Sequence, residues 1–262
     1  MGQLDRHLDG QIALITGIAA GMGTGIAEAF AEAGATVVGA DIDEPGGRAV
    51  MERLGSKASF MLGDVARVDE SDGLVQQVVD AHGRLDVLVN NAGVTKSLGF
   101  FDVTEGDWDR INSVNNRGLF FLMQAAARSM RDAGTGGRII NIASIAGKGY
   151  RGTSNVAYAG TKGSVIAMTR ISAQQLARFG INVNAICPGV TRTALFDQVI
   201  DELVERLGGT REEAEARAVR SIPLRRANDP EDIAALAIYL ASEAARNVTG
   251  QSWNVDGGLH WD

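Results

Sequence analysis

Residues 11–23 read QIALITGIAAGMG, a strand-like run that leads directly into a glycine-rich turn. The run at 11–16 is nearly all apolar, which is typical of a strand covered on both faces. The glycines let the backbone turn tightly, and an alanine-rich helical pattern follows at 23–33 and ends at Gly34. Exposed N–H groups at such a helix start can bind a pyrophosphate. The stretch therefore predicts a strand, a phosphate-binding turn and a helix, in that order.

Strand-like and helical patterns alternate along the rest of the chain. Further strands are predicted at 36–40, 58–62, 86–90, 138–142, 181–186 and 252–255. Further helices are predicted up to about 54 and at 71–82, about 107–132, 156–178 and 230–240. This pattern indicates an α/β fold with one doubly wound parallel sheet of about seven strands and helices on both faces. No linker interrupts it, so residues 1–262 are expected to form a single domain that binds ligands at the carboxyl ends of its strands.

Composition and charge exclude several classes of function. The 262 residues are 45% hydrophobic and 22% charged, with a net charge of −7 and no basic run, which argues against nucleic-acid binding. No apolar run approaches the ~20 residues that cross a membrane, and the first seven residues do not resemble a signal peptide. Cys187 is the one cysteine, expected to be buried, and the three histidines are scattered, so neither a disulfide nor a metal site is expected. A cytoplasmic protein is predicted.

Asp41 supplies the acidic residue that a nucleotide-binding turn needs at the end of the next strand. It follows Gly23 by 18 residues, where its carboxylate can accept hydrogen bonds from the adenosine ribose. The same charge would repel a 2′-phosphate, and neither the turn nor residues 42–43 offer an Arg or Lys to bind one. Aspartate is also common in ordinary turns at strand ends. We interpret Asp41 as a ribose ligand, which predicts NAD rather than NADP.

Two further polar segments are expected at the same edge of the sheet. Asp64 follows the third strand, and residues 90–93, which read NNAG, follow the fourth. Each alone is compatible with ordinary turn chemistry. Their side chains could join the strand ends or line an adenosine pocket.

Tyr158 and Lys162 form a candidate pair for proton transfer. They are four residues apart, so on a helix they share one face. An ammonium beside a phenol favours the phenolate, so the pKa of Tyr158 is predicted to fall from about 10 towards the working pH. A phenol of that kind can exchange a proton with an alcohol or a ketone. The same spacing also occurs by chance on ordinary amphipathic helices.

Ser144 and Asn115 are two more candidates. Ser144 lies just past the fifth strand, where its hydroxyl could donate a hydrogen bond to a developing oxyanion. It has no histidine partner in the sequence and does not resemble a nucleophile. Asn115 falls inside the long helix predicted at about 107–132, where asparagine lowers helix propensity.

Together these segments resemble the short-chain dehydrogenase/reductase family, over about residues 8–259. The order and spacing of that family are matched by TGIAAGMG at 16–23, NNAG at 90–93, Asn115, Ser144, YAGTK at 158–162, CPG at 187–189 and GQSWNVDGG at 250–258. The resemblance implies a Rossmann-type fold and a hydride transfer between a nicotinamide and a substrate carbon. It also implies a homotetramer, with helices at about 107–132 and 156–178 pairing between subunits and the C-terminal strands making a second contact.

The resemblance implies a catalytic role for four residues. Tyr158 would be the general acid/base and Ser144 would orient the substrate oxygen, so both would contact substrate. Lys162 would lower the pKa of Tyr158 and hold the nicotinamide ribose. Asn115 would hold a water molecule in a proton relay behind Lys162.

The predicted binding site for NAD extends over several segments of the chain. It combines the positions argued above from the residues with those that the resemblance adds, the latter including a carboxamide site around 190–193. The full set is Gly17, Gly21, Met22, Gly23, Asp41, Ile42, Asp64, Val65, Asn91, Ala92, Gly93, Tyr158, Lys162, Val190, Thr191 and Thr193.

Residues 193–224 have two interpretations. Leu195, Val199, Leu203 and Leu207 recur near helical spacing, as do Phe196 and Ile200, and the resulting apolar face could close over a substrate as a lid. An ordinary surface helix packed on its own domain has the same pattern.

Three functions remain open on the sequence alone. The first is an NAD-dependent dehydrogenase that acts on a small secondary alcohol or ketone. The second is an NADPH-dependent 3-oxoacyl-type reductase of the same family, which Asp41 disfavours. The third is a non-catalytic NAD-binding protein, which the intact set of four catalytic candidates disfavours. No nucleic acid or membrane partner is expected.

Overall fold

The predicted strand, turn and helix are present in the computed structural model, which describes residues 7–261. β1 (Ile12–Thr16) ends at the glycine turn, and α1 (Gly21–Glu32) begins inside that turn, at Gly21 rather than at Gly23 as predicted. The other strands are β2 (Thr36–Asp41), β3 (Ala58–Leu62), β4 (Val87–Asn90), β5 (Gly137–Ile142), β6 (Ile181–Pro188) and β7 (Ser252–Val255).

These strands form one seven-stranded sheet in the order β3-β2-β1-β4-β5-β6-β7. Every neighbouring pair is parallel, so the carboxyl ends of all the strands lie along one edge. The order reverses between β1 and β4, and ligands bind at such a switch point in open parallel sheets. The predicted α/β class and its single-domain Rossmann-type sheet are confirmed.

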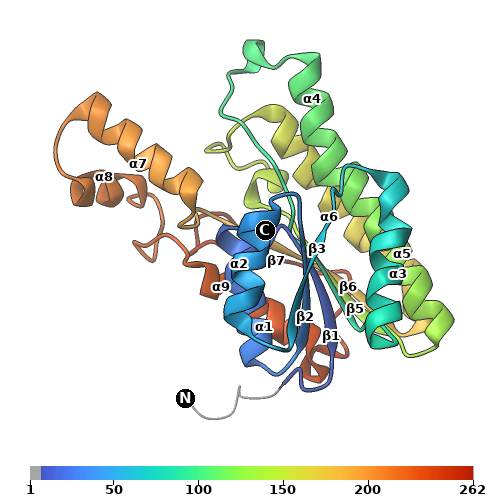
Figure 1. Ribbon diagram of the computed structural model, residues 1–262. Coiled ribbons are helices and arrows are strands. Elements are labelled where there is room, and N and C mark those ends of the chain that lie inside the picture. The colour runs from blue at the N-terminus through green and yellow to red at the C-terminus, as the bar shows by residue number, and fades with distance from the viewer. Residues whose placement is uncertain (1–6, 262) are drawn as a thin grey trace.

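Helices cover both faces of the sheet (Figure 1). One face carries α1, α2 (Glu44–Leu54) and α9 (Pro230–Ala241), and the other carries α3 (Ser71–His82), α5 (Leu119–Ala133) and α6 (Val156–Leu176). Short 3₁₀ turns lie at Val68–Glu70, Phe100–Asp102, Ile145–Lys148, Ala177–Phe179 and Glu243–Ala245. No helix in the described part of the chain is long and apolar enough to span a membrane.

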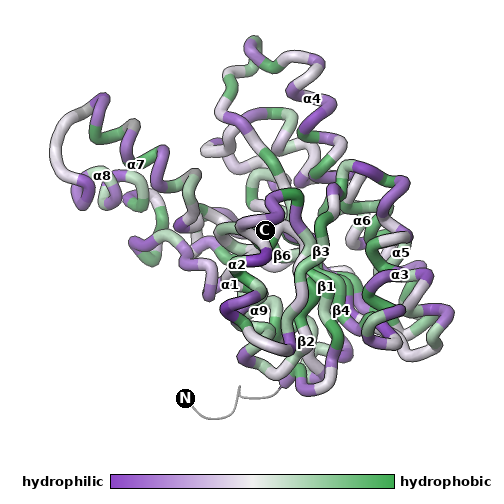
Figure 2. The backbone as a smooth tube through the Cα atoms, in the orientation of Figure 1, coloured by the Kyte–Doolittle hydropathy of each residue, from purple (hydrophilic) through white to green (hydrophobic). Residues whose placement is uncertain are grey.

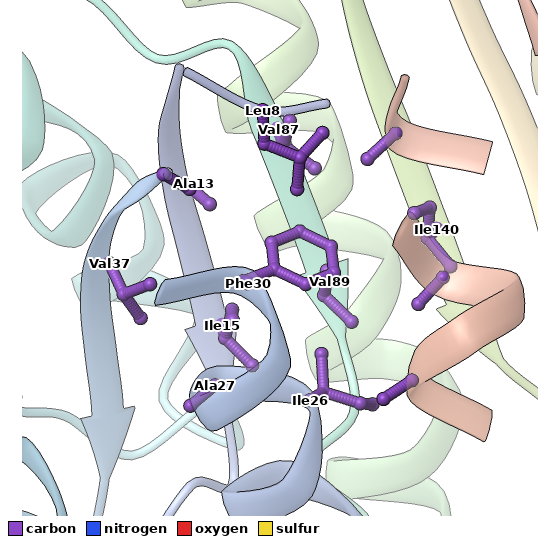
Figure 3. Close-up of a cluster of buried hydrophobic side chains, with 14 of the residues drawn as sticks. Leu8, Ala13, Ile15, Ile26, Ala27, Phe30, Val37, Val87, Val89 and Ile140 are labelled. Atoms are coloured by element: carbon purple, nitrogen blue, oxygen red, sulfur yellow. The ribbon is translucent and has the colours of Figure 1, made fainter. Parts of the chain in front are cut away.

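The core beside α1 shows why the first helix is fixed against the sheet. Phe30 is 0% exposed and packs with Ile26 and Ala27 of the same helix against apolar residues of β1, β2 and β4 (Figure 3). Figure 2 shows the strands as hydrophobic segments and the outer helices as mixed ones. Burial of a phenylalanine side chain contributes roughly 1.5–3 kcal/mol. Helix α1 therefore holds the glycine turn in place at the edge of the sheet.

The single helix predicted at about 107–132 is wrong. The chain instead forms α4 (Glu105–Asn112), a π-helical turn (Ser113–Gly118) and then α5. Two tertiary contacts fall on the π turn: the side chain of Asn115 bonds the backbone of Val94, and a Cβ at Gly118 would lie 2.2 Å from the carbonyl oxygen of Val65. Such turns inside helices are frequent at functional sites.

Residues 193–224 form two helices that project from the sheet, α7 (Ala194–Leu207) and α8 (Arg211–Ala218) (Figure 1). Phe196 and Ile200 of the predicted apolar face are buried in a small cluster, with Leu203 packed partly against it, whereas Val199 is 42% exposed. The side chains of Leu195 and Leu207 lie outside the described residues. The segment thus shares its small core with Val190, Ala227 and Leu259 of the rest of the domain, and its movement as a lid stays a prediction.

Candidate active site

A cleft of about 450 Å³ lies at the switch point of the sheet, beside the glycine turn. It is lined by eleven of the residues predicted to bind the cofactor: Gly17, Gly21, Met22, Asp41, Ile42, Asp64, Val65, Asn91, Ala92, Gly93 and Thr193. Ala19 and Ala20 of the glycine-turn motif line it too. The lining that the sequence did not indicate consists mostly of small or apolar residues outside any recognisable motif: Ala40, Asp43, Gly63, Val94, Val114 and Ala194.

Glycine is required in the turn because the backbone segments approach one another closely. A Cβ at Gly23 would lie 1.9 Å from the carbonyl oxygen of Gly17, so Gly23 supports the turn from beneath and does not line the cleft. Gly17 and Gly21 have φ values of +71° and +59°, which side-chain-bearing residues rarely adopt. The result is a cradle of closely packed backbone, in which a side chain at any of these three glycines would be strained or collide with a neighbour.

Asn91 and Thr16 join the end of β4 to the glycine turn. The Asn91 side-chain amide donates to the carbonyls of Thr16 and Gly17, at 2.9 and 3.0 Å. The Thr16 hydroxyl accepts from the backbone N–H groups of Asn91 and Ala92, at 3.1 and 3.0 Å. Asn91 Oδ1 is buried and has no hydrogen-bond partner among the described residues, so it can accept a bond from a ligand. Thr16, quoted only as part of the glycine-turn motif, proves to hold the two segments together.

Asp41 lines the cleft beside the glycine turn. Its carboxylate accepts from the backbone N–H groups of Ala19 at 2.9 Å and Asp43 at 3.0 Å. A carboxylate offers about four acceptor positions, so these two bonds leave room for ribose hydroxyls. Asp43 and Asp64 line the same cleft, and no Lys or Arg side chain is among its lining residues in the described chain.

The Ser144 side chain lies close enough to the Tyr158 phenol to affect its pKa. Burial raises the pKa of Tyr158, and the interaction with Ser144 lowers it by less. The predicted fall in the pKa of Tyr158 is therefore wrong for this structure. Lys162 Nζ lies 5.7 Å from the centre of the phenol ring and donates instead to the carbonyl of Ile142 at 2.7 Å.

Lys162 is more deeply buried than Tyr158, which is partly exposed. Its side chain is 3% exposed, and desolvation lowers its pKa to about 8, with a smaller opposing effect from Cys187. Cys187 is buried, as predicted. Desolvation disfavours a charge of either sign, so it favours neutral Tyr158 and neutral Lys162 together. That is why the simple pairing of an ammonium with a phenol did not predict the direction of the Tyr158 pKa shift.

Asn115 joins the π turn to both neighbouring segments of the site. The residue is 0% exposed; its Oδ1 accepts from Val94 N, and its Nδ2 donates to Val94 O, each at 2.8 Å. Nδ2 also contacts Thr161 Oγ1 at 3.3 Å. A Cβ at Gly93 would lie 3.4 Å from Asn115 Oδ1 and 3.6 Å from Lys162 Nζ, so these two side chains lie just behind the cleft wall at Gly93. The cleft lining itself includes neither Tyr158 nor Lys162, which were predicted to bind the cofactor. The water-holding role of Asn115 stays a prediction.

The predicted carboxamide segment is only partly at the cleft. Thr193 lines the cleft and lies against the glycine turn, where its methyl group would be 3.2 Å from a Cβ at Gly21. Val190 and Thr191 do not line it. Val190 O accepts from Asn228 N at 2.8 Å, and Thr191 forms a β-bridge with Asn228.

Comparison with known proteins identifies the family of this chain. Residues 17–260 match the enoyl-(acyl carrier protein) reductase family. Sorbitol dehydrogenase of Cereibacter sphaeroides is 39% identical over 253 residues, and galactitol 2-dehydrogenase of Agrobacterium fabrum is 37% identical over 253 residues; each match covers 96% of this chain and 98% of the relative. This chain belongs to the short-chain dehydrogenase/reductase family.

A solved structure gives the same result for the fold. The 3-ketoacyl-(acyl-carrier-protein) reductase of Brucella melitensis, complexed with NADH, superposes with a TM-score of 0.86 at 32% identity. The match covers 96% of this chain and 98% of that one. The likeness therefore extends over the whole sheet and its helices.

The family implies a nicotinamide dinucleotide, and the residues of the cleft fit one. The glycine cradle leaves room for a pyrophosphate, and Asp41 and the unpartnered Asn91 Oδ1 offer acceptors for hydroxyl groups. Within residues 7–261, no group of three or more His, Cys, Asp and Glu side chains is arranged to hold a metal ion.

Proposed function

We propose that this protein is an NAD(H)-dependent dehydrogenase that interconverts a secondary alcohol and a ketone. The observation that carries the proposal is the contact between Tyr158 and Ser144, beside Lys162, at the point where Gly93 borders the cleft. A non-catalytic NAD-binding protein would not need a buried lysine at this place, because burial of an ammonium opposes folding.

Tyr158 and Ser144 would act on the substrate oxygen. Both can hydrogen-bond that oxygen, Ser144 as the group that orients it and Tyr158 as the base that takes its proton during oxidation. Bound NAD would supply the hydride acceptor. Lys162, when protonated, stabilises the phenolate as it forms, since a charge 5.7 Å from the ring acts through a buried, low-dielectric region. The chain thus provides position and proton traffic.

The charges around the cleft support NAD over NADP. Three carboxylates, Asp41, Asp43 and Asp64, line it and would repel a 2′-phosphate. Arg67 lines an adjoining hollow together with Ile42 and Asp64, but its guanidinium already pairs with Asp69 and Glu70, each at 3.1 Å. No uncommitted cation thus lines this part of the described site.

A small polyol is the substrate class we propose. The two dehydrogenase relatives are named for sorbitol and galactitol, and both match this chain along nearly its whole length. The second candidate is reduction of a 3-oxoacyl thioester, the activity for which the Brucella reductase is named. That reductase is complexed with NADH, which is compatible with Asp41.

One set of assays separates these candidates. NAD reduction is measured with sorbitol, galactitol and other secondary alcohols, and NADH oxidation is measured with a 3-oxoacyl thioester, each with wild-type protein and Tyr158→Phe. Turnover of a polyol that is lost in Tyr158→Phe is the expected result. Turnover of the thioester alone would favour the second candidate, and turnover of neither would favour a binding protein.

We also propose a homotetramer in the cytoplasm, as in the family. Helices α5 and α6 share an outer groove that includes Phe120, Met123, Leu176 and Phe179. Apolar side chains in such a groove are suited to pairing with a second copy. Light scattering coupled to gel filtration tests the assembly, and a monomer would contradict it.

A further inference from the structure

Asn155 bonds two backbone groups that lie far apart in the sequence. It occupies the position before the first residue of α6 and is 4% exposed. Its Oδ1 accepts from the backbone N–H of Tyr158 at 2.7 Å, and its Nδ2 donates to the carbonyl of Lys96 at 2.7 Å. An N–H can only donate and a carbonyl can only accept, so these partners determine the orientation of the amide.

Asn155 lies at the centre of a joint between two loops. One loop, residues 94–98, follows β4, and the other, residues 149–155, precedes α6. Leu98 N donates to Ser154 O at 3.1 Å, and the hydroxyls of Thr95 and Ser154 are in contact. Asn155 adds the shortest backbone-directed bond of the joint, through Lys96 O.

The loop at 94–98 is attached to α6 at two points, one on each side of the Tyr158 side chain along the helix. Asn115 holds Val94, which lines the cleft, and contacts Thr161 of α6. Asn155 holds Lys96 and the N–H of Tyr158. Tyr158 lies between these two attachments along the helix. The position of Tyr158 relative to the cleft therefore depends on both attachments.

We propose that Asn155 is a positioning residue, which sets the place of the Tyr158 phenol relative to Ser144 and to the substrate oxygen. This inference rests on the proposed function of Tyr158. The cap stops α6 from fraying at its first turn, and the bond to Lys96 prevents that turn from moving away from the cleft wall. Proton transfer needs such control, because a displacement of about 1 Å at a reacting group can lower a rate by about 10²-fold.

Asn155→Ser separates the two halves of this role. Serine is a good helix cap but is too short to reach Lys96 O, so the helix start is retained and the bond to Lys96 is lost. We expect kcat/KM for the alcohol to fall by about tenfold or more, with the Kd for NADH changed less than about twofold. Asn155→Asp also keeps the cap oxygen and loses the donor, so it should show the same fall and serves if the serine variant does not fold.

The pH profile gives a readout that a general loss of stability would not move. The interaction with Ser144 is the contact that lowers the pKa of Tyr158. If Tyr158 moves away from Ser144, the limb of the kcat/KM profile that reports its ionisation should shift to higher pH in Asn155→Ser. An unchanged limb together with wild-type kcat/KM would overturn the proposal.

Asn182→Ser is the matched control. Asn182 also donates through Nδ2 to two backbone carbonyls, Arg246 O at 3.1 Å and Val248 O at 2.9 Å, but it lies at the start of β6, away from the catalytic edge. Both serine variants should lose a similar few degrees in Tm, and only Asn155→Ser should change the pH limb. The same change in Asn182→Ser would overturn the proposal.

Tyr158→Phe in the same assays distinguishes failure of the positioning role of Asn155 from failure of the proposed function. If Tyr158→Phe is inactive and Asn155→Ser behaves as wild type, only the positioning role fails. If Tyr158→Phe retains turnover, the proposed function itself fails, whatever Asn155→Ser does.

Discussion

The glycine cleft and the Tyr158 end of the site are built on different principles. The cleft is formed by backbone, with Gly17 and Gly23 in close approach and Asp41 bonded to main-chain N–H groups. The Tyr158 end is formed by side chains whose charge depends on burial, with Tyr158 raised and Lys162 lowered in pKa. Binding at the cleft should therefore respond to volume and to fixed charge. Turnover should respond to pH and to small displacements.

Loss of the phenol oxygen is the sharpest way to separate the two regions. Tyr158→Phe should lower turnover by about 10²–10⁴-fold, because it removes the general acid/base and leaves the ring in place. Affinity for NADH, measured by fluorescence titration, should stay near that of wild type. A parallel loss of NADH affinity would show that the two regions are not separable in this way.

Added volume in the glycine turn should act on NADH binding, whereas Tyr158→Phe acts on turnover. Gly23→Ala places a Cβ 1.9 Å from Gly17 O, so we expect NADH binding to weaken by up to about 3 kcal/mol as the turn shifts. Gly73→Ala is the control, since a Cβ at Gly73 in α3 meets nothing within 4 Å. Equal NADH affinity in the two variants would contradict the close-approach argument.

The buried ammonium should make stability depend on pH. The folded pKa of Lys162 is about 8, below its unfolded value of 10.5, so the unfolded chain binds more protons between these values. Wild-type protein should therefore gain about 2 kcal/mol of unfolding free energy relative to Lys162→Met between pH 7 and pH 10. Denaturant unfolding at both pH values measures this. Lys57→Met, at an exposed position, is the control for the loss of a lysine.

The smallest effect is expected from the fixed charge of Asp41 in the cleft lining. Asp41→Ala should move the ratio of kcat/KM for NAD to that for NADP towards NADP by about fivefold, since it removes one repulsion of about 1 kcal/mol. Steady-state kinetics with both cofactors measure the ratio. If the ratio stays where it is in wild-type protein, the ribose assignment of Asp41 is wrong.

Regular elements were predictable where the pattern repeats locally. All seven strands occur near their predicted positions, because an apolar β-branched run between turn residues indicates a buried strand without further information. The helix predicted at about 107–132 was wrong because the π turn coincides with contacts from Asn115 to Val94 and from Gly118 to Val65. Those partners come from other parts of the chain.

The candidate site was predictable as a set of residues but not as a set of interactions. Eleven predicted cofactor residues line one cleft, since parallel strands bring their carboxyl ends to one edge. Asn155 was given no role, because its partner Lys96 is 59 residues away and no spacing links them. Thr16 was likewise quoted only as part of a motif.

The sequence by itself determined the alternation of strands and helices, the glycine turn and the edge of the sheet at which the polar residues gather. Periodicity and turn chemistry act over a few residues, so the sequence shows them directly. Only the tertiary structure decided the break before α5, the attachment of Asn155 to the loop after β4, and the directions of the Tyr158 and Lys162 pKa shifts. These depend on desolvation and on bonds between distant segments, which exist only once the chain has packed.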